Sequence, residues 1–135
     1  MSLEPPDRIW IIGSDWWPRA YLRAELIERG HDAVGFITIR DAVITLTLGR
    51  ARQPALIVCD LHGQDLDRAL ARGLFQAGAP IIAIAGNVEA DDGWIRGLPW
   101  AAFLRRPITI GSVADMVGRL TLPPVSAPGE AARQA

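Results

Sequence analysis

One carboxylate in this sequence stands where proteins with parallel sheets place their functional side chains. Asp60 follows five apolar residues at 55–59. An uninterrupted apolar run of this kind predicts a strand that is covered on both faces, as in a parallel sheet. The carboxyl ends of such strands border a crevice in which functional side chains gather, so Asp60 is a candidate site residue. The alternative is that Asp60 caps the next helix or starts a turn.

The composition gives little support to other kinds of site. All 14 basic residues are arginine, which excludes Schiff-base lysine chemistry and the lysine of phosphate-binding loops. The 15 acidic residues leave the chain nearly neutral, so no nucleic-acid partner is expected. Cys59 is expected to be a small buried hydrophobe, and with only His31 and His62 available we expect no zinc site. No catalytic triad or pair of catalytic carboxylates can be assembled, so an enzyme is not predicted.

The length of 135 residues fits a single domain. We expect an N-terminal extension at 1–7, one folded domain at 8–122 and a disordered tail at 123–135, which is rich in proline, alanine and serine. No apolar run approaches the ~20 residues that a membrane span needs, and the N-terminus lacks the pattern of a signal peptide. We therefore expect a cytoplasmic protein that has no membrane partner.

The elements that must position Asp60 follow from the apolar periodicity, which alternates between strand-like and helix-like segments. Strands are predicted at 8–13, 31–36, 55–60, 80–86 and 101–105. Helices are predicted at 18–29, 40–52, 66–77 and 109–120, with a short or irregular helix within 87–100. This order predicts an α/β fold, with a doubly wound, five-stranded parallel sheet and helices on both of its faces.

The ends of the first, third, fourth and fifth strands should meet at the topological switch point of this sheet. The residues placed there are Gly13, Ser14, Asp15, Asp60, Ala85, Gly86 and Arg106. Doubly wound sheets host many functions, so this placement alone does not name one.

Three motifs in this order resemble the receiver domain of bacterial two-component response regulators over residues 8–120. The matching segments are Leu56-Ile57-Val58-Cys59-Asp60, the strand opening Pro80-Ile81-Ile82, and Arg106-Pro107 followed by a helix with Val113, Val117 and Leu120. The resemblance implies a flavodoxin-like three-layer sandwich. It also implies a signalling module whose partner is a histidine kinase or another signalling protein.

The resemblance gives Asp60 the role of phosphoacceptor, but it leaves the metal site incomplete. In receivers an acidic pair after the first strand helps to hold Mg²⁺, and here the matching residues are Gly13 and Ser14, with Asp15 displaced by one position. The backbone carbonyl of His62 would be the other metal ligand. Because Mg²⁺ prefers anionic oxygen ligands, we expect only weak Mg²⁺ binding.

The switch positions that the resemblance identifies also differ. Receivers place Thr or Ser where this chain has Ala85, which has no hydroxyl, and Lys where it has Arg106. The connection after Asp60 is also short for a receiver. Phe103 falls in the last strand, where receivers change conformation. We interpret the chain as a degenerate, or pseudo-receiver, domain, in which Asp60 is either phosphorylated or held in a structural ion pair with Arg106.

The tryptophans indicate contacts. Trp16 and Trp17 are predicted to lie in the loop after the first strand, where two indoles would cover or fill the metal pocket. Trp94 and Trp100 flank the short fourth helix, on the face that receivers use for dimers or output, so we predict a partner surface and a possible homodimer there.

The sequence therefore predicts a stand-alone receiver-like module that acts by protein contact. The alternative is a small-molecule sensor, or a phosphorylation-independent adaptor, that uses the same crevice.

Overall fold

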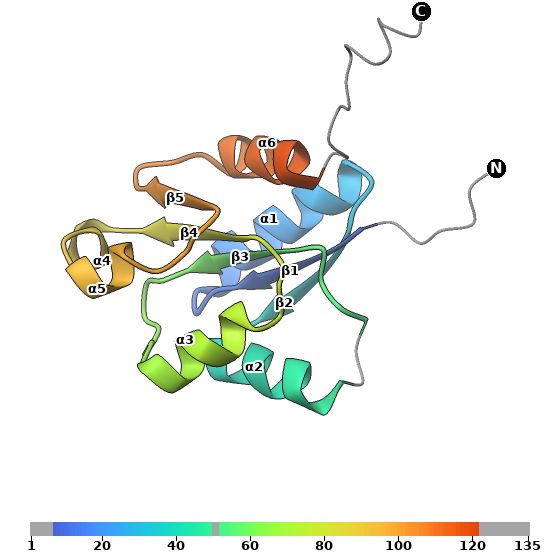
Figure 1. Cartoon of the computed structure of the whole chain (residues 1–135). Coiled ribbons are helices and arrows are strands. Elements are labelled where there is room, and N and C mark those ends of the chain that lie inside the picture. Colours follow the sequence, from blue (N-terminus) through green and yellow to red (C-terminus); the bar gives the residue numbers. More distant parts are fainter. Residues whose placement is uncertain (1–6, 50–51, 122–135) are drawn as a thin grey trace, which may run out of the picture.

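The computed structural model of the chain describes residues 7–49 and 52–121. Its five strands are all parallel and form one sheet in the order β2-β1-β3-β4-β5, with helices on both faces (Figure 1). The predicted fold class is therefore confirmed. The predicted extension at 1–7, apart from Asp7, and the predicted tail at 123–135 lie outside the described residues.

The elements alternate along the chain as the periodicity indicates. In order they are β1 (Arg8–Ile12), α1 (Trp16–Glu28), β2 (Asp32–Phe36), α2 (Ile39–Leu48), β3 (Leu56–Asp60), α3 (Arg68–Phe75), β4 (Ile81–Ala85), α4 (Asn87–Ala90), α5 (Gly93–Arg96), β5 (Ala102–Arg105) and α6 (Ile110–Thr121). The irregular segment predicted after the fourth strand is the pair of short helices α4 and α5. Within the described residues, no helix combines the length and apolar character needed to cross a membrane.

The sheet separates two buried layers because successive strand residues point to opposite faces. On one face α1 and α6 cover a cluster that includes Ile11 and Val58, and on the other α2 and α3 cover a cluster that includes Trp10 and Ile57 (Figure 1). Residues of β3 and β4 are buried on both faces. This double burial explains why their sequences are apolar without alternation.

The predicted ends of the four long helices differ from the observed ends by one to four residues. The second helix was predicted to continue to Arg52, but α2 ends at Leu48 because Gly49 adopts a left-handed conformation with φ of 66°. The first helix was predicted to begin at Pro18, but α1 begins at Trp16. Proline fits this position because the amides of the first helical turn have no intrahelical partner.

Candidate functional site

Asp60 and Arg106 meet at the carboxyl edge of the sheet. Asp60 is the last residue of β3 and its side chain is only 13% exposed. Arg106 directly follows β5, and its guanidinium donates a hydrogen bond from Nη2 to Oδ2 of Asp60. The other carboxylate oxygen accepts a hydrogen bond from the backbone N–H of His62 at 3.1 Å. Both oxygens of Asp60 are therefore engaged, and the ion pair expected as one alternative is formed.

The residues around Asp60 do not fit a Mg²⁺ site. The backbone carbonyl of His62 accepts a hydrogen bond from the Ser14 hydroxyl at 3.0 Å. Asp15 is exposed at the N-cap of α1, and Gly13 supplies no side chain. No group of three or more histidine, cysteine, aspartate or glutamate side chains that could hold a metal ion occurs among residues 7–49 and 52–121. A hard cation would find here the Asp60 carboxylate, which already pairs with Arg106, and the exposed Asp15.

Arg19 is a second cation near the site, and sequence reasoning missed it. Its Nη1 donates a hydrogen bond to the backbone carbonyl of Gly13. The side chain passes over Gly35 of β2 so closely that a Cβ at Gly35 would lie 3.1 Å from Arg19 Cδ. A glycine inside an otherwise apolar strand often marks such a close approach, so Gly35 was the available signal.

A cavity of about 260 Å³ opens beside the Asp60–Arg106 pair. It lies on the α1 and α6 side of the sheet, and Asp15, Arg19, Asp60 and Arg106 line it together with aliphatic side chains of β1, β3, β4, α1 and α6. The structure thus gathers three of the predicted site residues around one space and adds Arg19 to them.

Only one of the two tryptophans after β1 lines the cavity, so the prediction that both would cover or fill the site is wrong for Trp16. Trp16 and Trp17 form the first turn of α1, where they are 64% and 66% exposed. Their ring centroids lie 5.8 Å apart, and Trp17 lies 6.1 Å from Tyr21. Trp17 and Tyr21 line the cavity described above, whereas Trp16 does not. Their exposed rings leave the space open because a helix begins here in place of the expected loop.

Two of the three predicted switch residues, Ala85 and Phe103, face away from this cavity, whereas Arg106 lines it. Ala85 ends β4, is fully buried on the α2 and α3 side, and accepts a hydrogen bond through its carbonyl from the Arg106 backbone N–H at 2.9 Å. Phe103 in β5 is partly buried against the same cluster, with the Arg96 guanidinium 5.8 Å from its ring centroid. Neither side chain lines the cavity.

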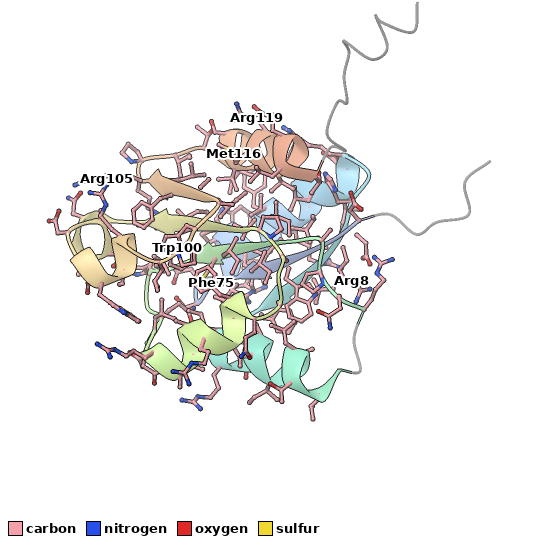
Figure 2. The ribbon with its side chains drawn as sticks, viewed as in Figure 1. Arg8, Phe75, Trp100, Arg105, Met116 and Arg119 are labelled. Carbon is pink, nitrogen blue, oxygen red and sulfur yellow. The ribbon has the colours of Figure 1, made fainter. Side chains whose placement is uncertain are left out.

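The two tryptophans of the predicted partner surface have different environments. Trp94 on α5 is 38% exposed. Trp100 is partly buried against α3, where its ring lies 5.1 Å from that of Phe75 and its Nε1 donates to the carbonyl of Ile95 at 2.7 Å (Figure 2). Trp94 is therefore the one that a partner could cover, and the role of the pair in partner binding stays a prediction.

Cys59 precedes Asp60 and is fully buried. Burial raises the pKa of its thiol well above the usual range, and the charge of neighbouring Asp60 raises it further. The thiol is thus protonated and inert, as expected of a buried hydrophobe.

The solved structures most similar to this chain include several receiver domains. A response regulator receiver protein from Pseudomonas putida superposes with a TM-score of 0.71 at 22% identity, covering 87% of this chain and 99% of the other. The receiver domain of a Francisella response regulator gives a TM-score of 0.68 at 16% identity, with coverages of 85% and 96%.

A third similar structure is the N-terminal domain of a response regulator/sensory box/GGDEF protein from Carboxydothermus hydrogenoformans. It has a TM-score of 0.70 at 19% identity and covers 85% of this chain and 94% of the other. No family model and no curated protein sequence matches the chain. The fold is therefore that of receiver domains, over nearly the whole length of those domains.

Proposed function

We propose that this chain is a receiver-like signalling module of a two-component or phosphorelay system, that it acts by contact with partner proteins in the cytoplasm, and that it is not an enzyme. Its proposed partner is a histidine kinase or another signalling protein, with self-association as a further possibility. The observation that carries the proposal is the receiver fold with Asp60 at the carboxyl end of β3, which supports the phosphoacceptor role proposed for this residue.

Phosphoryl transfer to Asp60 is proposed to be slow. Catalysis of this transfer depends on positioning and on charges that neutralise the phosphoryl oxygens. Gly13 and Ser14 bring no carboxylate for a metal, and the guanidinium of Arg106 already neutralises the acceptor. The hydrogen bonds from Arg106 and the His62 N–H also draw electron density from the Asp60 oxygens, which makes the carboxylate a weaker nucleophile toward phosphorus.

The switch that normally follows phosphorylation is proposed to be absent. Ala85 offers no hydroxyl to a phosphoryl group, and its side chain is buried on the far face of the sheet from the cavity. Phe103 packs against that same face. A modification of Asp60 would therefore lack the hydrogen bond that pulls these elements into a second arrangement.

Contact without phosphorylation is the second candidate, and the occupied oxygens of Asp60 favour it. The Asp60–Arg106 ion pair joins β3 to the end of β5 and holds one arrangement of the site. Trp94 on α5 is the exposed aromatic residue of the predicted partner surface. Aromatic residues of this kind are common anchors in protein interfaces.

The experiment that tests the proposal combines labelling with partner capture. The chain is incubated with acetyl phosphate and Mg²⁺, and intact-mass spectrometry is expected to find only a small phosphorylated fraction, which is lost in Asp60→Asn. The histidine kinases of the source cells are then tested for retention on the immobilised chain. Equal retention by the wild type and Asp60→Asn is expected of a phosphorylation-independent module.

A restoration variant serves as the control. Gly13→Asp with Ser14→Asp restores the acidic pair, and a Cβ at Gly13 would lie 3.7 Å from that of Asp60, an ordinary contact. We expect this variant to bind Mg²⁺ more tightly in isothermal titration and to label faster. Complete labelling of the wild type, or sub-millimolar Mg²⁺ affinity, would contradict the impaired site. Retention of no kinase by any variant would contradict the signalling proposal.

A further inference from the structure

The cavity beside Asp60 is lined by two chemically different sets of side chains. The apolar set comes from the sheet and from α1 and α6 and includes Leu22, Val58, Ile84, Ile110 and Val113. The charged set, called the polar end below, comes from the start of α1 and from the ends of β3 and β5 and consists of Asp15, Arg19, Asp60 and Arg106. An apolar space with a few convergent charged groups is the usual form of a small-molecule site.

We propose that this cavity binds a small monocarboxylate with a flat, apolar body. The carboxylate is held by the guanidinium groups of Arg19 and Arg106, and the body lies between α1 and α6. This site is additional to the signalling role proposed above and does not depend on it.

Arginine geometry supports a carboxylate at the polar end. Each guanidinium has five N–H donors, and the hydrogen bonds to Gly13 and Asp60 use one nitrogen of each. The remaining donors can form the paired hydrogen bonds that arginine makes with carboxylates.

The charge of the polar end favours a single negative charge on the ligand. The two arginines are balanced by Asp15 and Asp60, so the end is neutral before a ligand enters. A ligand with one negative charge can accept hydrogen bonds from both guanidinium groups, and it is repelled only moderately by the two carboxylates. A phosphate monoester carries up to two charges and meets greater repulsion.

The size and rim of the cavity favour a flat body. A cavity of about 150 Å³ is enough to hold benzene, so about 260 Å³ leaves room for a bicyclic ring. Trp17 and Tyr21 line the same cavity with side chains that are 66% and 52% exposed, which places aromatic faces where a ring would enter.

The test compares 2-naphthoate with 2-naphthamide, which has the same ring and no charge. Both are titrated into the wild-type chain and followed by isothermal titration and amide chemical shifts. We expect 2-naphthoate to bind with a Kd below about 1 mM and to shift the amides of Ile12, Gly13 and Val113. The amide is expected to bind at least about tenfold more weakly because it loses the charge-assisted hydrogen bonds.

Two variants locate the site and one controls for charge. Arg19→Gln is expected to weaken naphthoate binding about tenfold, and Ile110→Trp to abolish it by filling the space beside the apolar side chains. Arg119→Gln removes an exposed arginine from the outer side of α6 and should leave binding unchanged (Figure 2). Thermal melting confirms that each variant is folded.

Equal affinity for naphthoate and naphthamide would overturn the proposal, and this comparison needs no variant. No binding of naphthoate to the wild type, or unchanged binding by a folded Ile110→Trp variant, would overturn it as well. Inorganic phosphate or 2-naphthyl phosphate binding more tightly than 2-naphthoate would contradict the charge argument and reject the monocarboxylate.

Discussion

The two faces of the sheet bury the same strands but pack them in different ways. Aromatic rings fill the layer under α2 and α3, where Trp10 lies 4.6 Å from Phe36 and Phe75 lies 5.1 Å from Trp100, measured between ring centroids. In the described residues, the buried cluster under α1 and α6 is aliphatic. Most buried side chains that border the cavity of about 260 Å³ belong to the aliphatic layer, whereas the aromatic layer contributes Ile12.

The two layers are therefore expected to differ in how tightly their side chains are packed. Protein interiors are close-packed, and side chains beside an empty space lose dispersion contacts. Side chains of the aliphatic layer that face the space next to Asp60 therefore lack packing partners on that side. Four predictions test this contrast, beginning with the largest expected effect.

The first prediction compares the same truncation in the two layers. Leu74→Ala in the aromatic layer should lower the free energy of unfolding by about 4 kcal/mol, because Leu74 is fully buried. Leu22→Ala should cost about 2 kcal/mol, because Leu22 already faces the cavity on one side. Urea denaturation measures both. Equal losses would mean that the two layers are packed alike.

The second prediction concerns the ion pair at the mouth of the cavity. Arg106→Gln should destabilise the chain by about 2 kcal/mol because it leaves the mostly buried Asp60 carboxylate without its cation. Asp60→Asn combined with Arg106→Gln should recover most of that loss, since no charge remains to be desolvated. A double variant that is as unstable as the single one would show that the charge of Asp60 is not the cause.

The third prediction uses the thiol in the aromatic layer. Burial raises the pKa of Cys59, so the folded chain keeps a proton that the unfolded chain releases above about pH 8.5. Stability from this group is complete below that pH and falls by up to about 1.4 kcal/mol per unit above it. Chemical denaturation between pH 7 and 10 measures the slope. The Cys59→Ala variant should have a shallower slope, and identical slopes would contradict tight burial.

The smallest effects are expected at the edge of the aromatic layer. Trp100→Phe should cost about 1 kcal/mol, because it removes the hydrogen bond to the Ile95 carbonyl. Trp94→Ala should change stability by less than about 0.5 kcal/mol, yet weaken self-association or partner binding. Sedimentation measures the loss of self-association, and a pull-down assay measures the loss of partner binding. If alanine at both positions changes neither assay, the proposed partner surface is absent.

The sequence predicted the positions of the strands better than the ends of the helices. The apolar runs of β3 and β4 are long and uninterrupted, so the periodicity identified them directly. The start of α1 was missed because Pro18 was assigned to the first helical residue, although proline fits any position of the first turn. The end of α2 depended on the left-handed conformation of Gly49, one of several possible stopping points.

The candidate site was predictable where backbone topology alone positions a residue. Asp60 and Arg106 both follow the ends of parallel strands, so the fold brings them to one edge. Arg19 could not be placed in this way, because the direction of a helical side chain depends on how the helix packs. The cavity could not be predicted from the sequence either, because its volume depends on side chains from α1, α6 and three strands together.

The reactivity of Asp60 depends on its hydrogen bond from Arg106, for which another acidic group could compete. A carboxylate whose oxygens accept hydrogen bonds from Arg106 and the His62 amide is a stronger nucleophile while one of these bonds is broken. If the ion pair is favoured by about 2 kcal/mol, about one molecule in thirty is released at a given moment. An acidic side chain of a docked protein could draw Arg106 away and increase that fraction. Under the proposed phosphoacceptor role, the reactivity of Asp60 would therefore depend on whether a partner protein binds Arg106.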